Sequence, residues 1–179
     1  MVDKDTIDYI DKLGNEIGNM NYDYAWNFCE KKAVVMKNEK YGYINQNGVE
    51  ITDIIYDEAY NFKEEMALVK ENGKYFYLDG NGNRAFNMQY DYGESFSEGV
   101  AVVIIEGKYR YIDKKGNIIT KKGFEKAESF SEETALVKYK GKYGYINRSF
   151  DFIIPPIYDE AFSFEKKLAK VKKNKWYYI

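Results

Sequence analysis

One residue pattern recurs every 34 residues along this chain and constrains the fold more than any other feature. The pattern is clearest at residues 135–147, where two short runs of β-branched and aromatic residues flank a Lys-Gly pair. The equivalent stretch at 67–79 carries Asn72-Gly73, and such a pair supplies the positive φ angles that a tight hairpin turn requires. The pattern therefore predicts one β-hairpin in each repeat.

Several positions keep one residue type in every repeat. The tyrosine column is Tyr9, Tyr43, Tyr77, Tyr111 and Tyr145, with Tyr178 after 33 residues. The phenylalanine column is Phe28, Phe62, Phe96, Phe130 and Phe164. The alanine column is Ala33, Ala67, Ala101, Ala135 and Ala169, and the valine column is Val35, Val69, Val103, Val137 and Val171. Identity among the repeats of one chain reports what each unit needs in order to fold, so these columns predict the core.

Between the hairpins the sequence predicts turns. A column of Asp or Asn, such as Asn45 and Asp79, precedes a glycine, and this order is typical of turn residues rather than catalytic acids. Phe150 interrupts the glycine column and predicts a different turn in the last repeat. A short second strand is expected near 49–52. The spacing of three between Tyr56, Ala59 and Phe62 predicts a turn of 3₁₀ or α type.

The predicted fold class is all-β, because no long helical period occurs. Five tandem repeats, at about 9–42, 43–76, 77–110, 111–144 and 145–177, would form a single domain over 1–179. Such repeats bury a core by stacking, which favours an open twisted array of short antiparallel strands and hairpins. The alternative is a small closed five-bladed β-propeller-like ring. The open array is preferred because 34 residues are few for a four-stranded blade and both ends of the chain carry the same kind of strand.

The last repeat also has residues that are typical of the outer face of a repeat array. Lys170 stands in a column that is otherwise apolar, and five further lysines surround it at 166, 167, 172, 173 and 175. In a chain with a formal net charge of −2, such a run indicates a solvated face rather than a nucleic-acid patch.

Composition excludes several kinds of chemistry. The 179 residues contain no histidine, which removes Ser-His-Asp and Cys-His catalysis and the zinc sites that use histidine ligands. A single cysteine, Cys29, cannot form an internal disulfide and agrees with a reducing compartment. No apolar run approaches the roughly 20 residues of a membrane span, and the first residues lack the order of a signal peptide. We expect a cytoplasmic protein that is not an enzyme and has no cofactor, bound metal, nucleic-acid partner or membrane partner.

Several stretches resemble the bacterial WG-repeat family, also called KWG. They are Phe96–Val103, Gly107-Lys108-Tyr109, Tyr111-Ile112-Asp113 with Gly116, and Pro155–Asp159, and the resemblance extends over residues 9–179. The Trp-Gly pair of the family is replaced at each position, for example by Tyr41-Gly42 and Tyr109-Arg110. The resemblance implies a β-rich repeat that serves as an interaction module, with no assigned reaction and no catalytic residues.

The expected function is therefore a non-enzymatic protein-binding module, such as an inhibitor, an immunity protein or a scaffold in a bacterial cell. Its partner would be another protein or a second copy of this chain. The alternative is carbohydrate or cell-wall binding through exposed aromatic residues. Trp26, Tyr60 and Phe162 are the candidates for either role, because their column varies and holds glutamate at 94 and 128, which predicts partial exposure.

Two further residues are candidate binding residues. Ile104 belongs to the apolar run Val100–Ile105 and occupies a column that holds lysine at 70, 138 and 172, which predicts that its side chain is exposed. The competing interpretation is that Ile104 packs under the neighbouring linker. Arg110 stands where the family has the glycine of its Trp-Gly pair.

Overall fold

The computed structural model describes residues 9–179 except 11, 16 and 18–20. Within these residues all regular secondary structure is β, in fifteen strands that form five small antiparallel sheets. The all-β class and the tandem repeats predicted from the sequence are confirmed. The described residues contain no helix that is long and apolar enough to cross a membrane.

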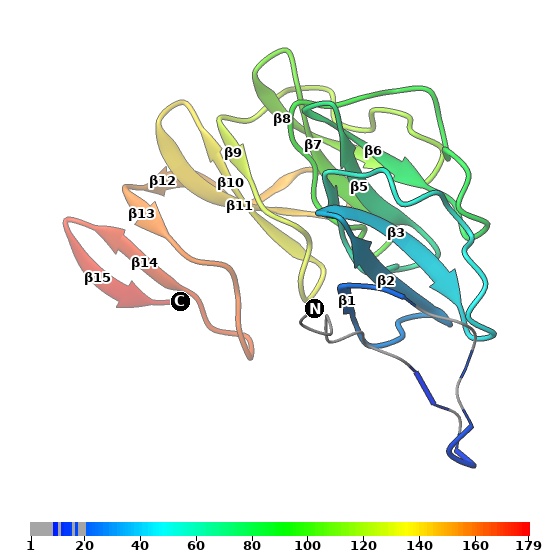
Figure 1. Cartoon of the computed structure of the whole chain (residues 1–179). Helices are drawn as coiled ribbons and strands as arrows, with labels where there is room; N and C mark the ends of the chain where they lie inside the picture. Colours follow the sequence, from blue (N-terminus) through cyan, green and yellow to red (C-terminus); the bar gives the residue numbers. More distant parts are fainter. Residues whose placement is uncertain (1–8, 11, 16, 18–20) are drawn as a thin grey trace. The chain divides into compact units, whose positions relative to one another are not determined.

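Each sheet is built around one hairpin (Figure 1). Sheet 1 contains β1 (Tyr24–Ala25), β2 (Lys32–Lys37) and β3 (Lys40–Asn45), and sheet 2 contains β4 (Glu58–Ala59), β5 (Ala67–Glu71) and β6 (Lys74–Leu78). Sheet 3 contains β7 (Val100–Ile105) and β8 (Lys108–Asp113). Sheet 4 contains β9 (Lys126–Ala127), β10 (Thr134–Tyr139), β11 (Lys142–Asn147) and β12 (Phe152–Tyr158). Sheet 5 contains β13 (Glu160–Ala161), β14 (Lys170–Lys173) and β15 (Lys175–Tyr178).

The chain divides into two compact units. Unit 1 spans residues 1–89 and holds sheets 1 and 2, whereas unit 2 spans residues 90–179 and holds sheets 3 to 5. The single domain over 1–179, and the choice of an open array over a closed ring, stay predictions.

The hairpin turns follow the local sequence. In sheet 2 the turn residues Asn72 and Gly73 have φ angles of 51° and 79°, and Lys140 and Gly141 of sheet 4 have 51° and 78°. Two successive residues with positive φ are the mark of a type I′ turn, whose twist matches that of the flanking strands. The register is the same in both hairpins, with Leu68 opposite Tyr77 and Leu136 opposite Tyr145. The hairpins predicted from the sequence are confirmed in every sheet.

The segment between the hairpins differs from the sequence prediction. The helical turn expected around Ala59 is wrong, because Glu58 and Ala59 form strand β4 beside Lys70 and Val69. Pairing with the hairpin edge outweighs the local spacing of three, since it satisfies backbone groups that a lone turn would leave open. The second strand expected near 49–52 is reduced to an isolated bridge from Ile44 to Glu50, whereas the equivalent segment of sheet 4 forms strand β12 beside β11.

The Asp/Asn column forms turns, as predicted. The Asn147 side-chain oxygen accepts the N–H groups of Ser149 and Asp151, both at 3.0 Å. The different turn expected at Phe150 is wrong, because Phe150 adopts a φ of 62° and keeps the glycine geometry. Its ring lies 5.5 Å from the ring of Tyr111, and this packing offsets the cost of a left-handed conformation at a bulky residue.

The hydrophobic core lies between successive sheets within each unit. In sheet 4, Ala135 and Val137 pack with Tyr111 of sheet 3, whereas Leu136 on the other face packs with Ala169 of sheet 5. Alternation of side chains along a strand thus buries both faces of a sheet between its neighbours. Lys170, which takes the position of Leu136 in sheet 5, is exposed, as expected for an outer face.

Within each unit, rings of the phenylalanine column pack against rings of the tyrosine column, as in Tyr43 with Phe62 and Tyr111 with Phe130. Phe62 and Phe130 are 3% and 2% exposed, and their rings lie 5.0 Å from Tyr43 and 5.2 Å from Tyr111. The buried tyrosine hydroxyl then donates a hydrogen bond to a backbone carbonyl 17 residues farther along the chain. These bonds are Tyr43 to Tyr60, Tyr111 to Glu128 and Tyr145 to Phe162, each at 2.6 Å. Each bond fixes a sheet to the first strand of the next repeat.

Truncation of the phenylalanine column should unfold the protein readily. We expect Phe62→Ala or Phe130→Ala to lower the free energy of unfolding by about 3–5 kcal/mol, because each change removes a large buried ring and leaves a cavity. Thermal and urea unfolding followed by circular dichroism measure this loss. Wild-type stability in either variant would contradict the assignment of the column to the core.

Removal of one buried hydroxyl should weaken the link between repeats. We expect Tyr111→Phe to lower the free energy of unfolding by about 1–3 kcal/mol, because the Glu128 carbonyl loses its donor. Tyr109→Phe is the matched control, since Tyr109 is half-buried, and we expect a change within about 0.5 kcal/mol for it. Equal losses in the two variants, measured by urea unfolding, would show that the Tyr111 hydrogen bond contributes nothing particular.

Candidate binding site

The Trp26 column follows directly after the first strand in sheets 1, 2, 4 and 5, and after the isolated bridge of Gly93 with Val103 in sheet 3. The N–H groups at this position bond across to the hairpin, from Tyr60 to the Leu68 carbonyl and from Phe162 to the Lys170 carbonyl, both at 3.0 Å. The carbonyl groups accept the buried tyrosine hydroxyls described above. The backbone is therefore held from two sides, while the side chain is left free to differ between repeats.

Trp26, Tyr60 and Phe162 are 41%, 43% and 55% exposed, so the partial exposure predicted from the sequence is confirmed. Their role in binding stays a prediction. Trp26 and Tyr60 line one groove of about 200 Å³ in unit 1, together with Val34, Ala59 and Asn61.

Other aromatic rings extend the exposed surface around these residues. The Trp26 ring lies 6.2 Å from Tyr24 and 5.8 Å from Tyr41. In unit 2 the Phe162 ring lies 6.0 Å from Trp176, which is itself 41% exposed. Each unit therefore offers a small cluster of rings at its surface.

Tyr60 belongs to a polar cluster in sheet 2. Its hydroxyl donates to Glu58 at 3.0 Å, and burial together with this bond raises the pKa of Tyr60 to about 12. The Lys70 ammonium donates to Glu58 at 2.7 Å and is the main reason that the pKa of this carboxyl lies below its usual range. Lys70, Tyr75 and Tyr60 thus surround one carboxylate with three donors.

Ile104 is half-buried, as are the lysines of its column at 70, 138 and 172, so its role in binding stays a prediction. Its N–H donates to the Tyr92 carbonyl at 3.0 Å, and it stands opposite Tyr109 on β8. In sheet 2, Glu58 stands opposite Lys70. The equivalent residue beside Ile104 in sheet 3 is Tyr92. An isoleucine replaces the lysine where a tyrosine replaces the glutamate, so the local environment suits an apolar residue.

Arg110 lies on the opposite face of β8 from the residues around Ile104. It stands opposite Val103, and its guanidinium donates to the Thr120 carbonyl at 3.4 Å. Adjacent residues of a strand point to opposite faces, so Arg110 and its neighbour Tyr109 cannot contribute to the same groove. The structure thus does not bring Ile104 and Arg110 together.

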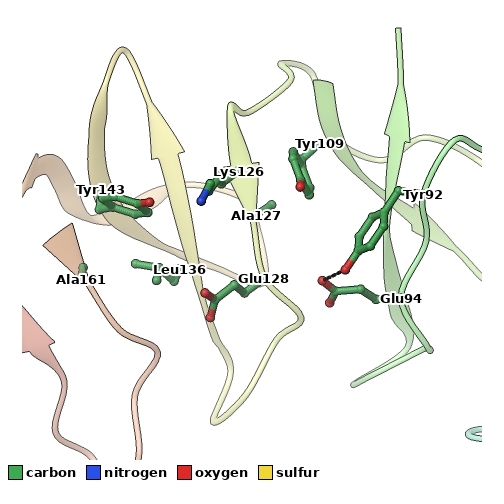
Figure 2. A pocket seen from close by; sticks show the side chains of 9 residues that line it. All are labelled: Tyr92, Glu94, Tyr109, Lys126, Ala127, Glu128, Leu136, Tyr143 and Ala161. Carbon is green, nitrogen blue, oxygen red and sulfur yellow. Dashed lines mark hydrogen bonds between the residues drawn. The ribbon is translucent and has the colours of Figure 1, made fainter. Parts of the chain in front are cut away.

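A second groove, of about 240 Å³, lies in unit 2 and was not found from the sequence (Figure 2). Its polar and aromatic lining comprises Tyr92, Glu94, Tyr109, Lys126, Glu128 and Tyr143. These residues come from sheets 3 and 4 and from the segments before β7 and after β9. They occupy the same positions in their repeats as residues of the unit 1 surface, such as Trp26 and Tyr60, and this correspondence is the signal that could have identified them.

Hydroxyl groups hold the two carboxylates of this groove. Glu94 accepts the Tyr92 hydroxyl at 3.0 Å and the Ser129 hydroxyl at 2.6 Å, and Glu128 accepts the Ser163 hydroxyl. Beneath them, burial and then the charges of Glu94 and Glu128 raise the pKa of Tyr111. The groove therefore combines fixed carboxylates, tyrosine rings and one lysine. No cluster of acidic residues or cysteine in the described part of the chain is arranged to hold a metal ion.

Comparison with solved structures shows a shared fold. The chain is similar to a eukaryotic initiation factor, with a TM-score of 0.55, 12% identity, and coverage of 86% of this chain and 51% of that one. It is also similar to Kluyveromyces lactis Hsv2p, with a TM-score of 0.53, 10% identity, and coverage of 92% of this chain and 62% of that one. The chain thus spans between half and two thirds of the length of these propeller-like proteins, and at such identities the likeness concerns the fold alone.

Comparison with curated proteins gives no match. A family model described as a WG containing repeat matches the chain five times in succession, at residues 9–41, 41–75, 75–109, 109–143 and 143–177. The matches follow the period that the tyrosine column marks and cover nearly the whole chain. The chain therefore belongs to the family of WG-repeat proteins.

Proposed function

We propose that this protein is a non-catalytic module that binds another protein through the exposed side chains of its repeats. The observation that carries the proposal is the position of the Trp26 column, where the backbone is fixed from two sides and the side chain is exposed and variable. A repeat built in this way can change its surface chemistry without changing its core. Repeat proteins use such surfaces to bind partners along several units.

The chemistry of the exposed residues favours a protein partner. Trp26 and Tyr60 line a groove without a charged residue, and Trp and Tyr are the side chains most enriched among residues that dominate binding energy at protein interfaces. Such rings bury a large area while losing little conformational freedom. A module of this kind would serve as an inhibitor, an immunity protein or a scaffold in a bacterial cytoplasm.

Carbohydrate binding is the second candidate. It is supported by the aromatic cluster around the exposed Trp26, whose ring lies 6.2 Å from the ring of Tyr24 and 5.8 Å from the ring of Tyr41. Faces of such rings can pack on the apolar faces of sugars. A glycan array probed with the wild-type protein separates this candidate from protein binding.

Loss of the two groove rings should weaken binding of the partner. We expect Trp26→Ala combined with Tyr60→Ala to reduce affinity at least about tenfold, because residues of this type each contribute more than about 1 kcal/mol at an interface. Quantitative pull-down from bacterial lysate, followed by calorimetry with the captured protein, measures the change. Light scattering of the purified protein tests self-association in the same way.

Val49→Ala combined with Ile118→Ala is the matched control. Both side chains are exposed, at 56% and 45%, and both lie outside the Trp26 column. We expect this variant to retain the partner. Retention of the partner by the Trp26/Tyr60 variant, or binding of glycans instead of proteins by the wild type, would contradict the proposed function.

A further inference from the structure

One pair of facing residues differs in sheet 4 from its counterparts in the other sheets. In sheet 2 the pair is Glu58 and Lys70, joined by an ion pair of 2.7 Å, and in sheet 5 it is Glu160 and Lys172, joined at 2.6 Å. In sheet 1 the pair is apolar, Tyr24 opposite Met36. The residues of these pairs are thus matched in chemistry across the strands.

In sheet 4 the same two positions hold Lys126 and Lys138, directly opposite each other on β9 and β10. Like charges in facing positions of a sheet lower its stability. A residue pair that breaks a local rule is where a functional site is expected. Sheet 4 therefore differs at this pair in a way that folding alone does not require.

A third residue, Tyr143, lies beside this pair of lysines, because it stands opposite Lys138 on β11. The Lys138 ammonium lies 5.3 Å from the centre of the Tyr143 ring, much as Lys70 lies 5.0 Å from Tyr75 in sheet 2. In sheet 2, Lys70 and Tyr75 are two of the three donors on the Glu58 carboxylate. Sheet 4 keeps the equivalent lysine and tyrosine, Lys138 and Tyr143, and holds Lys126 at the position of the carboxylate.

The nearby carboxylates are not arranged to neutralise these lysines. Within the described residues neither Lys126 nor Lys138 makes an ion pair. Figure 2 shows the Lys126 amino group on the Tyr143 side of β9, apart from the carboxylates of Glu128 and Glu94. Glu128 accepts the Ser163 hydroxyl, and Glu94 accepts two hydroxyls.

We propose that Lys126, Lys138 and Tyr143 form a docking site for a side-chain carboxylate on an acidic segment of a partner protein. The incoming carboxylate would take the place that Glu58 has in sheet 2. A protein segment is favoured over a free anion because Lys126 lines a groove that is also lined by the rings of Tyr109 and Tyr92. This inference rests on the proposed function and names the chemistry of one contact.

The test is binding of a fluorescent octapeptide of glutamate, with an amidated C-terminus, measured by fluorescence anisotropy. We expect binding that weakens as salt is raised, and we expect Lys126→Glu to weaken it at least about tenfold. The same variant recreates the Glu58–Lys70 pair of sheet 2, so its midpoint of thermal unfolding should rise rather than fall. A loss of binding would then not be due to unfolding.

Lys121→Glu is the matched control, because it makes the same change in net charge at an exposed lysine outside the groove. We expect it to keep wild-type affinity for the peptide. Equal losses in the two variants, equal binding of a glutamine octapeptide, or full binding by Lys126→Glu would overturn the proposal. The titration needs no natural partner, so its outcome is independent of the pull-down that tests the proposed function.

Discussion

The hydrogen bond from a buried tyrosine hydroxyl to the backbone of the next repeat is the interaction on which this structure depends. Tyr43, Tyr111 and Tyr145 each reach the carbonyl at the end of the following first strand. Burial raises the pKa of each hydroxyl, so it stays a proton donor throughout the physiological range of pH. A phenylalanine would fill the same space but leave that carbonyl without a partner.

This bond also explains why the repeats vary where they do. The residue whose carbonyl accepts the hydroxyl is the member of the Trp26 column, and its own N–H bonds to the hairpin. Both backbone groups are satisfied whatever the side chain is, so tryptophan, tyrosine, phenylalanine and glutamate are all compatible with the fold. At this position the backbone makes the same hydrogen bonds in each of these repeats, while the side chain at the surface varies.

Local signals predicted much of this fold. Asn72-Gly73 identified a hairpin turn, and the Asp/Asn column identified the turns that follow, because such turns depend on a few adjacent residues. The strand at Glu58 and the left-handed Phe150 were missed, because one forms by pairing with a hairpin and the other by packing under Tyr111. The groove of unit 2 was missed for the same reason, since its residues meet only once the sheets are in register.

The facing pairs show how far one repeat can depart from another. Glu58 with Lys70 and Tyr92 beside Ile104 occupy equivalent positions, and in each case both residues change together. Complementarity across strands, rather than a particular residue, is therefore what these sheets share at this position, and the facing lysines Lys126 and Lys138 of sheet 4 depart from it. Ile104 stands beside a tyrosine, and the same position holds lysine where its neighbour is a carboxylate. The chemistry of this surface is thus set pair by pair, which leaves each repeat free to present a different contact on an unchanged core.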